Sequence, residues 1–201
     1  VKSASDAAAE IGRLSFLSGT SAEEFQRYAA GAKVAGFEAD KLADVLKDVN
    51  DKTGEYLATG GGPLKDFFDQ IAPKIGLAAE AFRGLSGPQA LQLYYDSLEK
   101  ANVSQAQATF YMEALANDAT ALIPLLRDNG TEFKRIADEA ESLGLILDDK
   151  LIRASKEFNE NLDRLQGLSR SVAAEIGNAI IPALNDLAEE FLDARRAGLS
   201  F

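Results

Sequence analysis

The chain has 201 residues, a net charge of −11, 46% hydrophobic and 26% charged residues, and neither cysteine nor histidine. This length accommodates one or two domains with a buried core, and the missing residue types exclude disulfides, thiolate zinc sites, cysteine nucleophiles and imidazole acid–base chemistry. The negative charge disfavours nucleic acid and anionic membrane surfaces as partners, because both are bound through lysine and arginine.

The chain lacks a long apolar segment. No stretch reaches the ~20 apolar residues that cross a bilayer. The most apolar stretch, Ile176–Leu184, is short and contains Pro182. We therefore expect no membrane-spanning segment. The chain begins with Val1 rather than methionine, and we expect it to be a fragment of a longer protein.

The first sixty residues predict three helices. The first is alanine-rich and covers 3–17. Ser21 and Glu24 form a capping box, which indicates the start of the second, and Gly36 fits the position of positive φ that ends it. The third carries an apolar stripe at helical spacing, made by Leu42, Val45, Leu46 and Val49.

The strongest break follows at Gly60–Pro63, where a glycine triplet predicts a hinge near 60–62. Pro63 suits the first position of a helix, where its missing N–H costs nothing. Pro73 is expected to end that helix, and one short helix is expected at 78–83. The stripe between the two prolines consists of Leu64, Phe67, Phe68 and Ile71.

The stretch from 86 to 147 predicts four further helices, each with its own start or stop signal. No alternation of β-branched residues predicts a strand anywhere. The signals, in chain order, are capping boxes at Ser86/Gln89 and Ser104/Gln107, a cap at Asp118, a stop at Asn129–Gly130, a start at Thr131 and a stop at Gly144.

The last third of the chain carries a heptad-like seam, in which apolar residues recur at spacings of four and three. It predicts one helix over 149–181, roughly 50 Å long at ~1.5 Å per residue, which Pro182 interrupts. This helix either packs back on the preceding module or extends as a coiled coil, and Ser155 and Ser169 weaken the seam. The seam residues expected to serve association or packing are Leu151, Phe158, Leu162, Leu165, Val172 and Ile176.

The expected fold class is therefore all-α, without strands. A compact multi-helix module over 1–147 precedes a long amphipathic, heptad-like helix over 148–201 that is interrupted near Pro182. No internal repeat accompanies this division.

Several weak chemical signals have better structural explanations. Asp48, Asn50 and Glu55 resemble a calcium loop, but Thr53 stands where that loop needs glycine. The carboxylate pairs are typical of solvated helix faces rather than of a glycosidase, which needs two carboxylates across a cleft. The aromatic residues lack interleaved basic residues and so favour core packing over base stacking. The pairs are Glu23/Glu24, Glu139/Glu141 and Glu189/Glu190, and the aromatics are Tyr94, Tyr95, Phe110 and Tyr111. We expect no catalytic, cofactor or metal site.

Three segments carry more than helical periodicity. Residues 16–55 follow the pattern SG-S-EEFQR-A-AAK-AG-----L---L--LN-K-GE, and this pattern resembles a region of phage tail-length tape measure proteins. Residues 122–149 (LIPLLRDNGTEFKRIADEAESLGLILDD) and 155–191 (SKEFNENLDRLQGLSRSVAAEIGNAIIPALNDLAEEF) resemble two later family segments. The region 60–118 departs from the family pattern. In the first segment the matching positions are Gly19, Ser21, Glu23, Glu24, Phe25, Gln26, Ala29, Ala32, Lys33, Gly36, Leu42, Leu46, Asn50, Lys52, Gly54 and Glu55.

The resemblance implies a structural role. A tape measure occupies the lumen of the growing tail tube in the virion, sets tail length and is expelled ahead of the DNA at infection. The implied partners are the tail tube protein, tail assembly chaperones and tail tip or baseplate proteins, with self-association through the long helix. The implied locations are the virion tail and, during assembly, the host cytoplasm. The alternatives are a generic helical coiled-coil interaction module and a cell-wall hydrolase domain, against which the absence of histidine and cysteine argues.

Overall fold

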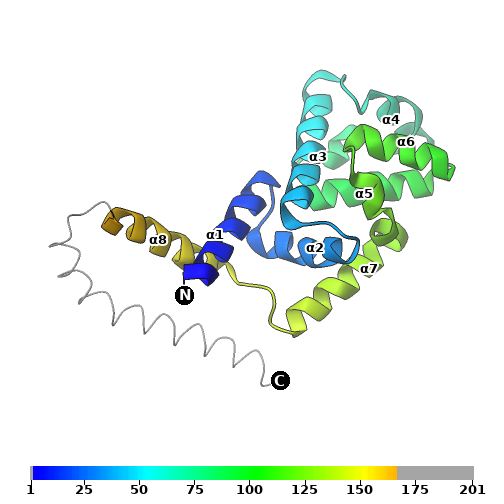
Figure 1. Cartoon of the computed structure of the whole chain (residues 1–201). Coiled ribbons are helices and arrows are strands. Elements are labelled where there is room, and N and C mark those ends of the chain that lie inside the picture. Colours follow the sequence, from blue (N-terminus) through cyan, green and yellow to red (C-terminus); the bar gives the residue numbers. More distant parts are fainter. Residues whose placement is uncertain (1, 167–201) are drawn as a thin grey trace.

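The computed structural model describes residues 2–166, and these form an all-α fold (Figure 1). Within that range there is no strand, which confirms the expected fold class. The α-helices are α1 Lys2–Leu17, α2 Ala22–Val34, α3 Ala39–Thr59, α4 Lys65–Gln70, α5 Gly87–Lys100, α6 Gln105–Leu115, α7 Ile123–Ser142 and α8 Asp149–Gln166. Short 3-10 helices occupy η1 Ala72–Ile75, η2 Ala79–Phe82 and η3 Ala119–Leu122.

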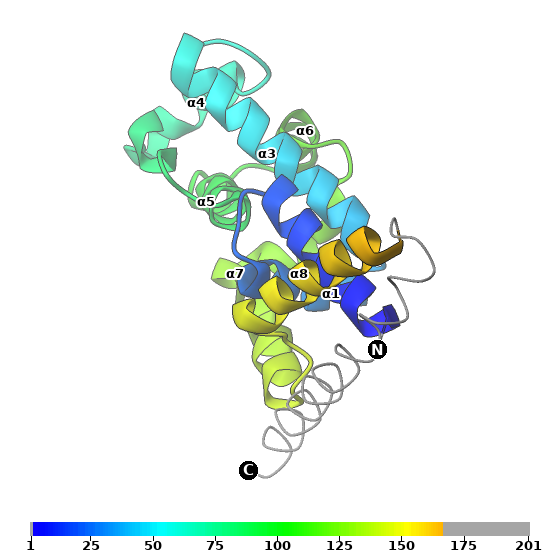
Figure 2. The ribbon, with the colours of Figure 1, turned by 90° about the vertical axis from the view of Figure 1, so that its left-hand side faces the viewer.

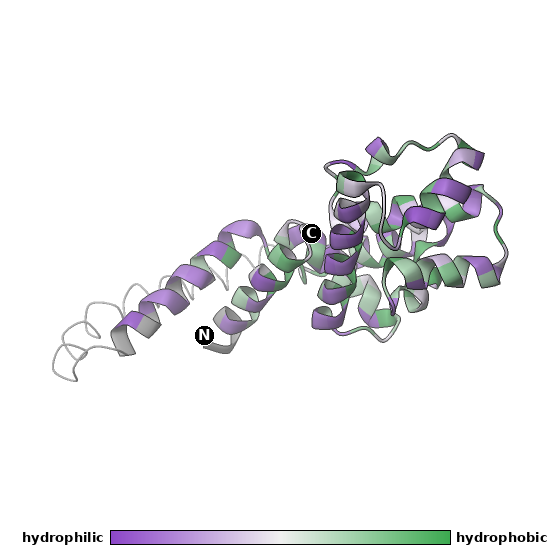
Figure 3. Cartoon of the chain, turned by 90° about the horizontal axis from the view of Figure 1, so that it is seen from above, coloured by the Kyte–Doolittle hydropathy of each residue, from purple (hydrophilic) through white to green (hydrophobic). Residues whose placement is uncertain are grey.

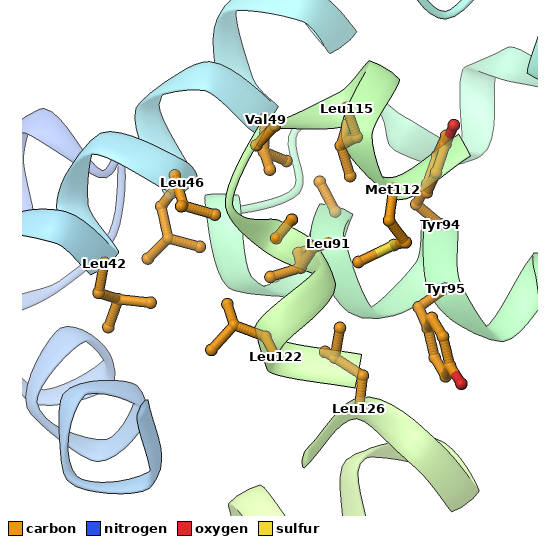
Figure 4. Close-up of a cluster of buried hydrophobic side chains, with 14 of the residues drawn as sticks. Leu42, Leu46, Val49, Leu91, Tyr94, Tyr95, Met112, Leu115, Leu122 and Leu126 are labelled. Carbon is orange, nitrogen blue, oxygen red and sulfur yellow. The ribbon is translucent and has the colours of Figure 1, made fainter. Parts of the chain in front are cut away.

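The main hydrophobic core lies between α3 and the helices that pack beside it. Its central side chains point toward one another from α3, α5, α6, η3 and α7 (Figure 4). The stripe predicted for the third helix supplies one wall of this core. The labelled members are Leu42, Leu46, Val49, Leu91, Tyr94, Tyr95, Met112, Leu115, Leu122 and Leu126, all of them buried.

Aromatic side chains fill the far end of the core. The ring of Phe67 stacks on that of Tyr94, with centroids 4.1 Å apart, and it meets Phe82 edge-on. Tyr56 in turn stacks on Phe68 at 3.9 Å. Such pairs add about 0.5–1.5 kcal/mol beyond their buried area. Aromatic contacts thus join α4 and η2 to α5 within the region 60–118.

Two of the predicted capping boxes are confirmed in full. Ser86 with Gln89 and Ser104 with Gln107 each show the reciprocal pair of hydrogen bonds. The third forms by half: Ser21 Oγ accepts the N–H of Glu24, but the Glu24 carboxylate accepts from two hydroxyls elsewhere instead of from Ser21 N–H. Those hydroxyls belong to Thr20 and Ser86.

Other predicted boundaries shift by a few residues. Asp118 makes no side-chain cap for η3; its carboxylate lies 3.4 Å from Lys41 Nζ instead. Pro63 lies in the turn before α4, which begins at Lys65. Pro73 falls in the first turn of η1, and the helix expected at 78–83 is the 3-10 helix η2.

Glycines end two helices as predicted. Gly36 has φ +82°, and its N–H donates to the carbonyl of Lys33 while Phe37 N–H donates to that of Ala32, which is a Schellman motif. α3 ends at Gly60, with φ +68°, and the glycine triplet joins it to α4. Whether this junction bends as a hinge stays a prediction.

The predicted stop at Asn129–Gly130 appears as a break within α7. Asp128, Asn129 and Gly130 all have positive φ, at 53°, 58° and 68°. Thr131 Oγ1 donates to the carbonyl of Asp128 at 2.6 Å and so ties the start of the second half of α7 to the break. A left-handed conformation costs roughly 1–2 kcal/mol at each residue other than glycine, so the packing on both sides of the break must hold it.

Candidate functional site

α1 and α8 lie side by side and extend away from the body, which is our name for residues 22–142, α2 to α7 (Figures 1 and 2). Seen from above, the helix that carries the N-terminus and its neighbour project from the body with polar residues on their outer faces (Figure 3). Because α8 begins the region predicted to be the long helix, its junction with α1 is the candidate site.

Among the described side chains, those at the contact between α1 and α8 are mostly small. Ala8 of α1 is 1% exposed and Ile152 of α8 is 7% exposed; with Ala22 they form a hydrophobic cluster separate from the main core. Ile11 and Leu147 pack at its edge. We call these five residues the junction patch.

Close approach of the two helices depends on Gly12. A Cβ at this position would lie 3.3 Å from Cγ2 of Ile152, tighter than ordinary van der Waals contact. Ser155, one helical turn after Ile152, is also buried. The face of α8 that meets α1 is therefore centred on Ile152 and Ser155.

The residues of the predicted seam can now be located in the structure. Leu151 is half-buried at the start of α8. Phe158, Leu162 and Leu165 fall within α8, but their side chains lie outside what the structure describes. Val172 and Ile176, like Pro182, lie outside the described residues. The sequence pattern did not identify Ile152, the residue after Leu151. The buried face of α8 contains Ile152 and Ser155, and Ser155 also belongs to the predicted seam.

The connector between α7 and α8, Leu143–Asp148, is fastened to α2 by Gln26. The side chain of Gln26 accepts from the N–H of Leu147 at 2.8 Å and donates to its carbonyl at 2.8 Å. The same Nε2 also donates to the carbonyl of Ala22 at 3.1 Å. Gln26 is buried, so these bonds satisfy an amide that would otherwise be costly to bury.

Both ends of the connector have defined caps. Gly144 N–H donates to the carbonyl of Glu141, and Leu145 N–H donates to that of Ala140, which ends α7 with a Schellman motif. Asp148 caps α8, because its carboxylate accepts the N–H of Leu151 at 2.7 Å. The predicted stop at Gly144 is thus confirmed.

α2 and α7 form the support beneath this connector. Phe133 lies against Gly31, where a Cβ would come within 2.4 Å of its ring, and its ring centroid is 4.8 Å from that of Tyr28. Arg27 bonds Asp138 at 2.6 Å and also pairs with Glu141. A glycine-permitted aromatic contact and a forked ion pair therefore hold α2 on α7.

The charges at this support stabilise one another. Hydrogen bonds from Lys134, first, and from Arg27, second, hold the pKa of Asp138 below its ordinary value. The same pairing with Asp138 raises the pKa of Arg27. Groups shifted in these directions favour their charged forms, so Asp138 and Arg27 face each other as an ion pair.

The other residues singled out in the sequence have structural roles here. Asp48, Asn50 and Glu55 lie within helix α3, not in a loop, and Asn50 donates to the carbonyl of Ser18 at 2.7 Å. Glu139 pairs with Arg135. Tyr94, Tyr95 and Tyr111 are buried, as core packing requires, whereas Phe110 is 56% exposed. Glu189 and Glu190 lie outside the described residues.

Within residues 2–166, no group of three or more acidic side chains is placed to bind a metal ion. None of the helices in that range is long and apolar enough to cross a bilayer.

The segments that carry the resemblance to tape measure proteins come together in space. Residues 16–55 span the end of α1, α2 and most of α3; residues 122–149 span α7 and the connector; α8 contains the start of 155–191. α2 packs on α7 and α1 packs on α8. The departing region, 60–118, packs beside these segments: its helix α5 lies against both α3 and α7, and Ser86 donates a hydrogen bond to Glu24 of α2. No protein-family model, no curated protein and no solved structure matches the chain.

Proposed function

We propose that the chain is part of a phage tail tape measure, the structural protein that sets the length of the tail tube and leaves it ahead of the DNA. The observation that supports this most is the convergence of the three resembling segments. Two of these segments are joined by direct hydrogen bonds between Gln26 and Leu147, which lie 121 residues apart. A family pattern that maps onto one packed unit is better explained by a shared structure than by chance similarity of helical sequences.

The fold supports a division of labour within such a protein. Residues 22–142 form a body with a hydrophobic core, whereas α8 starts a region predicted to be one helix over 149–181. A ruler needs a length that is proportional to residue number, and a helix gives ~1.5 Å for each residue. We propose that the body acts at the start of assembly or at ejection, and that measurement begins after Asp148.

The proposed partners follow from that role. They are the tail tube protein around the helix, assembly chaperones, tip or baseplate proteins and further copies of the chain, with the tail lumen as final location. Net charge −11 would keep the protein from adhering to the DNA that follows it, since like charges repel.

The test is tail length in a phage or prophage that carries the gene. Deleting Leu151–Asn178 in frame removes 28 residues and should shorten every tail by about 40 Å if they measure as a helix. Tail length is measured by electron microscopy. Uniformly shortened tails are the expected result.

A duplication of the same residues is the matched control, and it should lengthen every tail by the same amount. Full-length tails from both variants would contradict a measuring role for this region. Normal tails after deletion of the entire gene would overturn the tape measure proposal itself.

One observation favours a second function, a generic helical interaction module. α8 lies against α1 through Ile152 and Ser155, which is how an amphipathic helix completes an independent domain. A gene neighbourhood without tail tube, chaperone and tip genes would favour this alternative.

A further inference from the structure

We propose that α8 is a detachable helix, which swings on the connector Leu143–Asp148 and is held in its docked position by Gln26. This inference rests on the proposed function only for the use of the motion. The motion itself is a property of the chain and is tested without a phage.

The junction patch is small compared with the main core. Its buried members are Ala8, Ala22 and Ile152, and two of these are alanines with only one methyl group each. Hydrophobic stabilisation is proportional to the apolar area removed from water. Helices α3, α5, α6 and α7, by contrast, share large leucine and aromatic side chains. As judged from the described side chains, separating α8 from α1 therefore requires less free energy than opening the body.

The connector is suited to act as a pivot. Leu143 and Leu145 are 56% and 65% exposed, so neither anchors it to the body. Both ends are capped by bonds within α7 and within α8, and those bonds persist when α8 moves. Segments with few buried apolar contacts are those that open locally below the free energy of global unfolding.

Gln26 is the clamp that opposes this motion. Its amide bonds both backbone groups of Leu147, the last apolar residue before the cap of α8. Gln26 lies on α2, which is part of the body. Its bonds therefore hold the connector at Leu147 against the body and do not contact α8 itself. Loss of these bonds should shift the population toward the undocked state.

In the proposed function this device keeps α8 folded back until assembly begins. Undocking leaves the body intact, exposes Ala8 and Gly12, and frees α8 to extend along an axis of its own. The docked form would be the soluble state of the chain before tube protein polymerises around it.

Thiol labelling tests the motion, because the chain contains no cysteine and each introduced thiol is the only one. Ala8→Cys reports on the junction patch and Ala90→Cys, in α5, reports on the main core. Both alanines are buried, at 1% and 2% exposure, so the two variants are matched. Labelling is followed in native buffer and normalised to the unfolded chain.

The expected result is that Ala8→Cys reacts at least tenfold faster than Ala90→Cys, through an opening smaller than global unfolding. Adding Leu122→Ala should then accelerate only Ala90→Cys, because Leu122 is buried in the main core and stays packed in the undocked state. Adding Gln26→Met should accelerate Ala8→Cys about tenfold or more, since it removes two bonds to the connector.

Equal labelling of the two sites, or equal acceleration of both by Leu122→Ala, would overturn the proposal, since α8 would then leave only when the whole protein unfolds. Ile152→Cys provides a second probe. It makes the side chain smaller, whereas Ala8→Cys makes it larger, so it repeats the test without pushing α1 and α8 apart. If Leu122→Ala prevents folding, Tyr94→Phe serves as the milder core perturbation. Failure of these experiments leaves the tail-length test unaffected, and the reverse also holds.

Discussion

Gln26 and Leu147 are joined by a pair of hydrogen bonds, each 2.8 Å long, across 121 residues of sequence. The side-chain amide of Gln26 presents a donor and an acceptor to the backbone of Leu147, much as a neighbouring strand would. Because Gln26 is buried on α2, its two bonds fix where the connector crosses the body, whereas Asp148 caps the start of α8.

We predict that Gln26→Met lowers the free energy of unfolding by about 1–3 kcal/mol, since it removes the bond to Ala22 and both bonds to Leu147 and leaves the Leu147 backbone groups unpaired. Methionine keeps the approximate volume, so packing is preserved. Urea denaturation measures the change. The neighbouring Arg27→Met is the control: its ion pairs to Asp138 and Glu141 are partly exposed and should contribute at most about 1 kcal/mol. Equal losses in both variants would contradict the clamp.

Gly31→Ala should weaken the contact between α2 and α7. The new Cβ would lie 2.4 Å from the Phe133 ring, and overpacking of this kind costs about 1–3 kcal/mol. The helix propensity of alanine offsets roughly 1 kcal/mol of that. Denaturant titration should show a net loss that Phe133→Leu partly rescues in the double variant.

Gly54→Ala is the matched control for that prediction. Gly54 also lies inside a helix, α3, but a Cβ there meets nothing within 4 Å. The substitution should therefore stabilise the protein by about 1 kcal/mol. A stabilising effect at both positions would show that Phe133 moves away at no cost.

How far the sequence predicts this fold depends on whether a signal is local. Ser86 and Ser104 predict their capping boxes because both partners lie within one helical turn. Gly36 predicts its helix end for the same reason. By contrast, Glu24 is close to Ser21 in sequence but bonds Ser86, and this choice depends on tertiary packing.

The candidate site was only partly predictable for a related reason. The stripe through Leu151 and the stripe through Ile152 overlap at Ser155, and periodicity alone does not choose between them. The choice is made by Gly12 of α1, whose missing side chain admits Ile152. Gln26 bonds a backbone 121 residues away. Neither the sequence around Gln26 nor the sequence around Leu147 predicts this contact.

Tyr94 gives the fold an alkaline pH dependence. Burial raises the pKa of Tyr94 above its ordinary value, and its hydroxyl donates to the carbonyl of Tyr111 at 3.0 Å. A raised pKa in the folded state means stability that is complete below the unfolded pKa of about 10 and is lost as pH rises above it.

Tyr94→Phe tests this sign. At pH 8 the variant should be less stable than the parent by about 1 kcal/mol, the contribution of one buried hydrogen bond. Above pH 10 the parent should lose up to about 1.4 kcal/mol more per pH unit than the variant, so the two stability curves should cross between about pH 10.5 and 11. Urea midpoints across this range measure both curves. Parallel curves would contradict ionisation of Tyr94 on unfolding.

A disulfide should fix α8 on α1. Gly12→Cys with Ile152→Cys places two thiols where a Cβ at position 12 already lies 3.3 Å from Cγ2 of Ile152, which is close to the geometry that a disulfide needs. The bond should form on mild oxidation and be detected as faster migration on a non-reducing gel. Closing a loop of this length should raise the free energy of unfolding by up to about 5 kcal/mol.

Arg13→Cys with Ile152→Cys is the control, because it closes nearly the same loop. Arg13 is exposed and lies near Asp40 and Asp44 of α3. This second pair should therefore oxidise slowly. Equal oxidation of both pairs would show that α8 has no fixed face toward α1.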